Sequence, residues 1–182
     1  MNRKKLVNDS KFLALVLRHK PETIGLTLDD HGWADIDTLL SCFQSHNKNI
    51  TREELNEIVA TDNKKRYTIS EDGKKIRAAQ GHSVQVDLQL DQKEPPNALY
   101  HGTADRFLDS IMRNGLLPQS RNYVHLSADI NTATIVGKRH GKPVVLELDI
   151  PAMKSDGKVF YQAENGVWLT NCVEPKYLKR VQ

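Results

Sequence analysis

Three neighbouring side chains near the N-terminus could bind an anion. Arg18, His19 and Lys20 follow an apolar stretch and stand directly before Pro21. Guanidinium groups match phosphate oxygens with paired N–H donors, and a histidine adds a donor that can transfer a proton near neutral pH. A structural explanation is also open, because cations in the last turn of a helix are stabilised by its exposed carbonyl groups. Residues elsewhere in the chain are needed to choose between the anion-binding and the structural explanation.

Two further arginines could complete a phosphate site. Arg66 closes the run DNKKR, and Arg121 stands just before a predicted strand. Each of them alone is typical of a solvated surface charge. Together with Arg18 and His19, they supply the several planar cations that bind a phosphate dianion best. The spacing shows that the parts exist, and it does not show that they converge.

Two histidines on separate predicted strands form a second candidate group. His101 stands in LYHGT, before Gly102, which permits close backbone approach, and Thr103. His125 stands in YVHLS, where alternation of faces points it away from both apolar neighbours. A lone strand histidine is more often structural. Each of these two, however, is followed two positions later by a hydroxyl residue (Ser127 after His125), which strengthens a functional interpretation.

The first half of the chain predicts three helices and then a hairpin, which is the order of a winged helix. The signals are apolar periodicity, capping residues and a Glu-Asp-Gly turn between two alternating stretches. The buried stripe of the first helix consists of Phe12, Leu13, Val16 and Leu17. The predicted segments are a helix from a cap at Asp9 or Ser10 to about Lys20, a helix from Asp35 or Asp37 to about Gln44, a helix beginning at Thr51, and a hairpin around 71–73.

The second half mixes strands and helices without a regular βαβ repeat, so the predicted class is α+β. The predicted segments are a strand at 97–102, a helix at 104–115, a strand at 122–127, a helix at 129–141, a strand at 143–150 and a hairpin at 159–170. The helix at 104–115 is expected to turn Phe107, Leu108, Ile111 and Met112 inward. Charges and two prolines interrupt the pattern between the halves, which predicts lobes at 1–84 and 97–182 joined by a linker at 85–96.

Composition sets the limits for these hypotheses. The 182 residues are 38% hydrophobic and 27% charged, which is typical of a soluble globular protein. A formal net charge of only +3 excludes a heavily basic nucleic-acid binder, so an anion site must consist of a few placed arginines. No apolar run approaches 18 residues and the start is not a signal peptide, which predicts a cytoplasmic protein without a membrane segment. Nothing indicates an oligomer, so a monomer is expected.

Cysteine and histidine usage gives two further expectations. Cys42 and Cys172 stand far apart and lack a CxxC partner, so we expect reduced thiols that fill core space. The seven histidines show no metal-ligand spacing, so no metal site is predicted.

Six sequence blocks point to a known family. LRHKP, HGWADIDTLL, KKRYTIS, LYHGT, RNYVHLS and ENGVWLT occur in this order from about Ser10 to Thr170. They resemble the signature blocks of the RNA 2'-phosphotransferases, often called tRNA 2'-phosphotransferases. The HGT block alone is shared with other ADP-ribosyltransferases, whereas the combination with RHKP, KKR and HLS is very specific.

The resemblance implies a winged-helix lobe for RNA and an ADP-ribosyltransferase-like lobe for NAD, a consumed co-substrate, with no metal. It implies that the catalytic residues are Arg18, His19, Arg66 and Arg121, and that the NAD-binding residues are His101, Gly102, Thr103, His125, Ser127 and Val167. Val167 stands where many ADP-ribosyltransferases carry a glutamate. A fixed carboxylate there would repel a phosphate dianion, at a cost that rises as water is excluded.

The reaction that the resemblance implies removes an internal 2'-phosphate from RNA, as at a tRNA splice junction. An RNA-2'-phospho-ADP-ribose intermediate forms with release of nicotinamide, and it then yields 2'-hydroxyl RNA and ADP-ribose 1'',2''-cyclic phosphate. One alternative is an ADP-ribosyltransferase that stops after the first step and modifies a terminal nucleic-acid phosphate or a protein. Another is a non-catalytic RNA-binding module.

Overall fold

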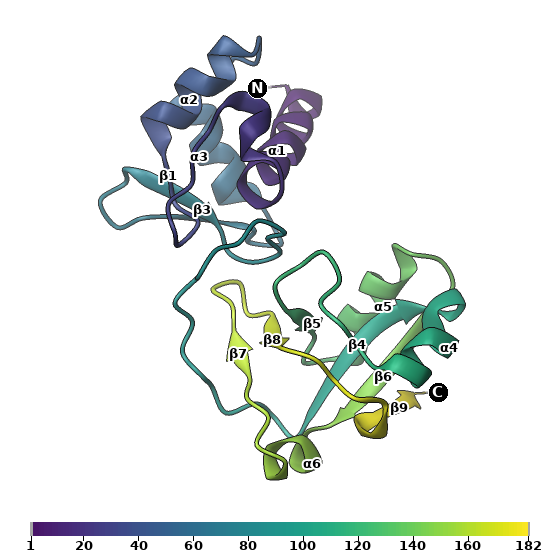
Figure 1. Ribbon diagram of the computed structural model, residues 1–182. Coiled ribbons are helices and arrows are strands. Elements are labelled where there is room, and N and C mark those ends of the chain that lie inside the picture. The colour runs from purple at the N-terminus through teal and green to yellow at the C-terminus, as the bar shows by residue number, and fades with distance from the viewer. Residues whose placement is uncertain (1, 182) are drawn as a thin grey trace. The chain divides into compact units, whose positions relative to one another are not determined.

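Two compact units, Met1–Gln89 and Leu90–Gln182, make up the chain. The computed structural model describes residues 2–181. Each unit combines helices with small antiparallel sheets, which confirms the predicted α+β class (Figure 1). The division between the units falls inside the segment where prolines and charges interrupt the sequence pattern.

The first unit contains three α-helices and one three-stranded antiparallel sheet of order β1-β3-β2. Its elements are α1 (Arg3–Arg18), the 3-10 helix η1 (Pro21–Ile24), β1 (Ala34–Asp35), α2 (Ile36–Ser45), α3 (Arg52–Thr61), β2 (Tyr67–Ile69) and β3 (Lys75–Ala78). The hairpin between β2 and β3 is the predicted one, and it pairs Ile69 with Ile76. The predicted caps Asp35 and Thr51 begin α2 and α3.

Helix α1 carries the apolar stripe on which the first core forms. Leu13, Val16 and Leu17 are fully buried, as their spacing predicts. Phe12 is only partly buried and meets the fully buried Phe43 edge to face, with ring centroids 5.3 Å apart. Burial of these side chains holds the end of α1 in a fixed place.

The predicted start of α1 at Asp9 or Ser10 is wrong. The helix begins at Arg3, because the Asn2 side chain caps it and accepts from the backbone N–H of Lys4. Lys5 Nζ then donates to Asp9 at 2.8 Å and to Glu54 of α3 at 2.9 Å. The second of these contacts spans 49 positions in sequence, so helical periodicity gives no sign of it.

The second unit contains two three-stranded antiparallel sheets, of order β4-β6-β9 and β5-β8-β7. Its elements are β4 (Ala98–Ala104), α4 (Asp105–Asn114), β5 (Val124–Leu126), α5 (Ile130–Lys138), β6 (Pro143–Asp149), α6 (Ile150–Ser155), β7 (Tyr161–Gln162), β8 (Trp168–Thr170), the 3-10 helix η2 (Pro175–Tyr177) and β9 (Leu178–Val181). The two sheets are joined where Tyr100 and Ser127 exchange backbone hydrogen bonds of 2.8 Å. The predicted hairpin around Asn165 and Gly166 forms between β7 and β8.

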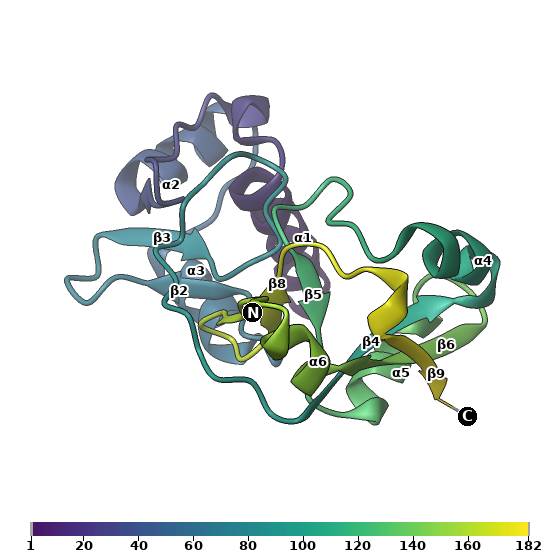
Figure 2. The ribbon, with the colours of Figure 1, turned by 60° about the horizontal axis from the view of Figure 1, so that its bottom comes forward.

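Helix α5 packs against β4 with almost no space between the two backbones, and both ribbon views show it beside β4 and β6 (Figures 1 and 2). A Cβ on Gly102 would lie 1.7 Å from the carbonyl oxygen of Ala133 in α5. A Cβ on Gly137 would likewise lie 2.6 Å from the Thr103 carbonyl oxygen. The close approach that Gly102 was expected to permit is therefore the approach of α5.

Helix α4 corrects part of the predicted core. Leu108 and Ile111 are partly buried against the core, but Phe107 and Met112 are exposed, contrary to the prediction. The Arg106 guanidinium lies 4.6 Å from the centroid of the Phe107 ring and covers it instead. Gly115 ends the helix at φ 82°, as predicted.

Neither cysteine lies in the core, which corrects the expectation that both fill it. Cys42 is partly exposed and Cys172 is exposed, and both are free thiols. Cys42 packs only at the edge of the first core. Within residues 2–181, no helix is both long and apolar enough to cross a membrane.

The Gly102 contact gives a test of the second unit. We expect Gly102→Ala to lower the free energy of unfolding by about 3 kcal/mol or more, since α5 must move off β4 to admit the methyl group. Gly157→Ala is the matched control: nothing lies within 4 Å of its Cβ, but its φ is 82°, so only about 1–2 kcal/mol of backbone strain is expected. Urea unfolding of both variants measures the difference. Equal losses would contradict the packing argument.

Candidate active site

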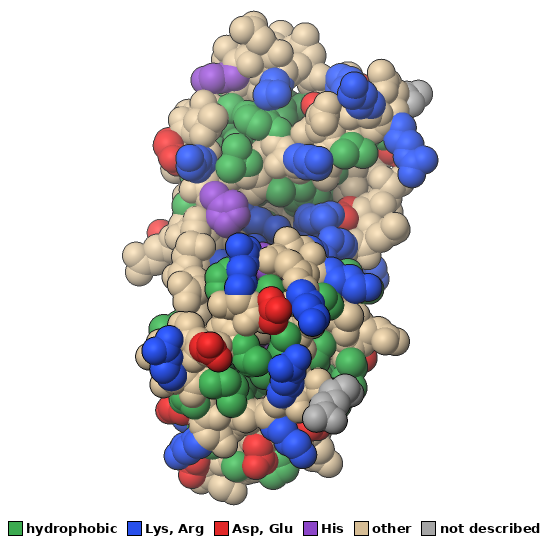
Figure 3. All heavy atoms as spheres, turned by 90° about the vertical axis from the view of Figure 1, so that its right-hand side faces the viewer, with side chains coloured by type: hydrophobic (Ala, Val, Ile, Leu, Met, Phe, Trp, Pro, Cys, Tyr) green, Lys and Arg blue, Asp and Glu red, His purple; other side chains and the backbone are tan. Residues whose placement is uncertain are grey.

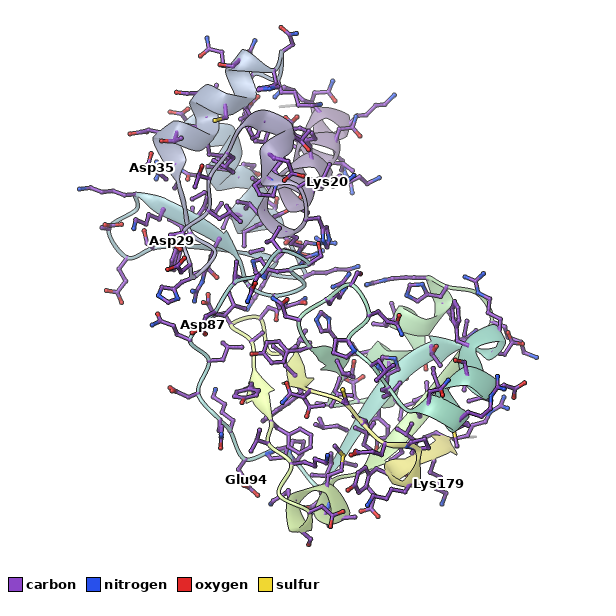
Figure 4. All side chains as sticks on the ribbon, in the orientation of Figure 1. Lys20, Asp29, Asp35, Asp87, Glu94 and Lys179 are labelled. Carbon is purple, nitrogen blue, oxygen red and sulfur yellow. The ribbon has the colours of Figure 1, made fainter. Side chains whose placement is uncertain are left out.

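The first group of predicted site residues lies at the C-terminal end of α1. Arg18 is its last residue, His19 is its cap at φ −130° and ψ −46°, and Lys20 follows (Figure 4). The His19 and Lys20 N–H groups both donate to the Leu15 carbonyl, at 3.0 and 2.9 Å. The Arg18 carbonyl accepts from Ser83 N–H at 2.9 Å, so a segment 65 positions later closes the helix end.

Arg66 is held by a buried carboxylate. Asp62, the C-cap of α3, accepts from Arg66 Nη1 at 2.6 Å and from the Arg66 backbone N–H at 2.7 Å. The Asp62 side chain is 6% exposed and the Arg66 side chain is 31% exposed. The guanidinium group is therefore anchored on one side while part of it remains accessible at the surface.

Tyr67 connects Arg66 with α1. Its hydroxyl donates to the Ser10 carbonyl at 2.7 Å. Burial raises the pKa of Tyr67, while the Ser10 side-chain hydroxyl, 3.3 Å from the Tyr67 oxygen, and the positive charges of Arg18 and Arg66 lower it. Both guanidinium groups therefore act on the same hydroxyl, which places Arg18 and Arg66 in one neighbourhood of the first unit.

Arg77 and His82 belong to the same neighbourhood, and the sequence analysis did not identify them. The buried Arg77 guanidinium stacks on the Trp33 ring at 4.4 Å from its centroid. His82 is 1% exposed, and neither of its ring nitrogens has a hydrogen-bond partner. Burial, together with the charges of Arg18, Arg77 and His19, lowers the pKa of His82 to about 4. His82 is therefore neutral at pH 7.

In the second unit, a hydrogen bond between two strands fixes the tautomer of His101. Its Nδ1 lies 2.9 Å from the His125 backbone carbonyl oxygen, which can only accept, so Nδ1 carries the proton. Desolvation lowers the pKa of His101, and the neighbouring His140 adds to this, while the bond to His125 opposes it. The neutral ring presents Nε2 as a hydrogen-bond acceptor.

Other predicted residues lie at the end of the β5-β8 pairing. Leu126, the last residue of β5, pairs with Trp168, the first residue of β8, so Ser127 and Val167 are the residues next to this pair. Ser127 is also bonded to Tyr100, the residue before His101. The side chain of His125 is partly exposed between the buried Val124 and Leu126, as the alternation predicts, whereas Thr103 is buried.

Arg121 lies in the turn before β5, where its N–H donates to the Pro118 carbonyl at 3.1 Å. Partial desolvation of its guanidinium group, and after it the positive charge of Arg139 at the end of α5, lower the pKa of Arg121. Two like charges therefore act on each other in this part of the second unit, an arrangement that favours an anion. Arg139 was not predicted as a site residue.

Two further features of the described residues bear on the choice of site. Within residues 2–181, no three His, Cys, Asp or Glu side chains are grouped as metal ligands would be. A shallow hollow of about 360 Å³ beside α2, lined among others by Ile24, Thr38 and Cys42, holds none of the predicted site residues. On the face seen in Figure 3, Asp and Glu lie among Lys and Arg rather than apart from them. Anion binding therefore depends on placed side chains, as the low net charge predicts.

Fixed cations around a histidine are a combination of side chains that suits a phosphate group. The model of the "RNA 2'-phosphotransferase, Tpt1 / KptA family" matches residues 4–172. The chain is 54% identical over 179 residues to the RNA 2'-phosphotransferase of Escherichia coli strain K12, covering 98% of this chain and 97% of that protein. It is 55% identical to a probable RNA 2'-phosphotransferase of Shigella boydii serotype 18, again over 98% of this chain and 97% of that protein. The chain belongs to the RNA 2'-phosphotransferase family, as the resemblance of its sequence blocks indicated.

The burial of His82 makes the stability of the protein depend on pH. Its pKa is about 4 in the folded state and about 6.5 in an unfolded chain, so acid favours unfolding. The contribution of His82 is fully present above pH 6.5 and is lost as the pH falls toward 4. Between pH 7 and pH 5, we expect this residue alone to lower the free energy of unfolding by about 2 kcal/mol.

The measurement is urea unfolding at pH 7 and pH 5 for the natural protein and for His82→Gln, which cannot titrate. The variant keeps the other titrating groups, including His101, so the difference between the two pH responses isolates His82. An identical pH response in both proteins would contradict the assignment of a neutral, buried His82.

Proposed function

We propose that this protein removes an internal 2'-phosphate from RNA and consumes NAD in doing so. The observation that carries the proposal is the cationic cluster at the end of α1, where Arg18 and His19 lie in the neighbourhood of the anchored Arg66. Membership of the RNA 2'-phosphotransferase family supports this activity and, with it, an enzymatic role.

The fold supports a division of labour between the units. Three helices followed by a β2-β3 hairpin suit a winged-helix lobe, which we propose binds the RNA. The small antiparallel sheets of the second unit, with α5 packed on β4, suit an ADP-ribosyltransferase-like lobe. We further propose a cytoplasmic enzyme, since both cysteines are free thiols.

The cationic cluster suits a phosphate dianion for an electrostatic reason. Arg18 and Arg66 keep their charge at every physiological pH, because guanidinium groups do not titrate there. The end of α1 itself carries a partial negative charge, so backbone groups offer the phosphate no attraction and the side chains must supply it. His19 adds the one group of this set that can release or take up a proton near pH 7.

The second unit offers residues that fit NAD. Neutral His101 presents an acceptor nitrogen, which matches the hydroxyl groups of a ribose. We propose that His125, Ser127 and Val167, which lie on or next to the paired strands β5 and β8, line that site. The bond that NAD supplies is the one between ribose and nicotinamide, which breaks readily because nicotinamide leaves as a neutral base.

In the first proposed step, an oxygen of the RNA 2'-phosphate attacks the ribose carbon that carries nicotinamide. The protein need only hold the phosphate in line, a task for Arg18 and Arg66. Val167 is uncharged, so it does not repel the incoming phosphate dianion as a carboxylate at this position would.

In the second step, the adjacent 2''-hydroxyl of that ribose attacks phosphorus, and the RNA 2'-oxygen leaves. The proton of the hydroxyl is lost and a proton is gained by the leaving oxygen, so a group that transfers protons is needed. We assign this to His19, and we assign stabilisation of the charge on the phosphoryl oxygens to Arg18 and Arg121. This step distinguishes the proposed enzyme from a simple ADP-ribosyltransferase.

A single reaction tests the proposal: the protein is mixed with NAD and a short RNA that carries one internal 2'-phosphate, and the products are identified by mass. We expect NAD-dependent loss of the phosphate together with a cyclic-phosphate ADP-ribose. ADP-ribosylated RNA that persists would indicate a transferase without the second step. Intact RNA and intact NAD, with the protein shown to be folded, would leave only a binding module.

Alanine variants of Arg18, His19 and Arg121 test the assignment of roles. If these side chains act mainly in the second step, each variant should slow turnover by about 100-fold or more and accumulate ADP-ribosylated RNA. Quenched reactions analysed by mass show the intermediate directly. Equal loss of both steps would point to substrate binding instead, and full turnover would refute the assignment.

A further inference from the structure

The segment that follows β3 is anchored against the end of α1. Ser83 and Val84 donate their N–H groups to the Arg18 carbonyl at 2.9 and 3.3 Å. His82, one position earlier, is buried, and its Nε2 lies 3.3 Å from where a Cβ on Gly32 would be. Buried packing on one side and two hydrogen bonds on the other hold residues 82–84 in place.

This anchored segment reaches the ring of His19. Ser83 Oγ lies 2.8 Å from His19 Nδ1, a contact between residues 64 positions apart. His19 is the cap of α1 and has non-helical backbone angles, so the helix does not fix the orientation of its ring. With Nδ1 engaged by Ser83, the ring can contact a phosphate only through Nε2.

A hydroxyl is a special partner for a histidine, because it can both donate and accept. When His19 is neutral, Ser83 can donate to Nδ1, and the ring proton then resides on Nε2. When His19 is charged, Ser83 accepts from Nδ1, and Nε2 again carries a proton. With Ser83 as the donor to the neutral ring, an Nε2–H group is present in both states of His19.

His101 shows the opposite arrangement within the same protein. Its Nδ1 faces a carbonyl, which can only accept, so the neutral ring has its proton on Nδ1 and an acceptor at Nε2. An acceptor suits hydroxyl groups, whereas a phosphate oxygen needs a donor. The partner of Nδ1 therefore decides which ligand each histidine can serve.

We propose that Ser83 is the positioning residue for His19: it fixes the ring and keeps Nε2 protonated toward the RNA 2'-phosphate. The inference rests on the proposed function, because it presupposes that His19 acts on that phosphate. Ser83 acts through His19 and contacts no reacting atom, so its loss should affect kcat more than the KM for NAD.

The kinetic test compares Ser83→Ala with Ser83→Thr, which keeps the hydroxyl. We expect kcat to fall about tenfold in the alanine variant and to be largely restored in the threonine variant, with little change in the KM for NAD. Ser45→Ala is a matched control, because Ser45 donates only to the Ser41 carbonyl within α2 and should leave kcat unchanged. A Ser83→Ala variant with the natural kcat, or a threonine variant as slow as the alanine one, would overturn the proposal.

A double-mutant cycle separates this inference from the function on which it rests. If Ser83 acts through His19, the variant carrying both His19→Ala and Ser83→Ala should be no slower than His19→Ala alone. A slow His19→Ala with independent, multiplying losses would overturn the positioning role and leave the proposed function standing. A His19→Ala variant with full turnover would refute the role of His19 itself, and the inference with it.

A readout that needs no substrate covers the case in which the kinetic variants are poorly folded. Nitrogen-15 NMR of the histidine rings, recorded on the natural protein at a pH where His19 is neutral, reports which nitrogen carries the proton. We expect the Nε2–H tautomer for His19 and the Nδ1–H tautomer for His101. A neutral His19 with its proton on Nδ1 would overturn the proposal.

Discussion

Cations gathered in one place repel each other, and this repulsion is the constraint around which the first unit is organised. The charges of Arg18 and Arg66 both act on Tyr67, and those of Arg18 and Arg77 both act on His82. The Asp62 carboxylate lies beside the Arg66 guanidinium, and the Trp33 ring lies against that of Arg77. At Arg18 it is the backbone that is held, because its carbonyl accepts from Ser83 and Val84. Fixed positions of this kind suit a phosphate site.

The same constraint explains why the histidine next to these arginines is uncharged. A protonated His82 would add a further charge in a place from which water is largely excluded, so the ring is neutral at pH 7. A neutral ring can fill space beside the cations and support residues 83 and 84. The cluster thus includes one buried, neutral histidine, His82, beside the histidine that we propose acts on the phosphate, His19.

What the sequence predicted well was local. The hairpins at 71–73 and 165–166, the Thr51 capping box and the Asp35 cap depend on residues a few positions apart, and all of them form. The start of α1 was wrong because the cap at Asn2 was not recognised, and Phe107 was placed inward because periodicity cannot show how little of α4 meets the core. Ser83 and Arg139 were missed because their partners are set by tertiary structure. Asp62, four positions before Arg66, and GHS after a strand were visible signals.

His19 and His101 show how the fold can give two residues of the same type different hydrogen-bonding roles. His101 meets a carbonyl because β4 and β5 are tied together at Tyr100 and Ser127, and that carbonyl leaves Nε2 only as an acceptor. His19 meets a hydroxyl because the chain after β3 returns to the end of α1, and that hydroxyl leaves Nε2 able to donate. Strand pairing therefore determines the proton on the His101 ring, and we propose that Ser83, brought in by closure of the helix end, does so for His19. The sequence blocks RHKP, HGT and HLS identify the histidines. Whether Nε2 of His19 or His101 donates or accepts depends on the partner of Nδ1, which the sequence does not show.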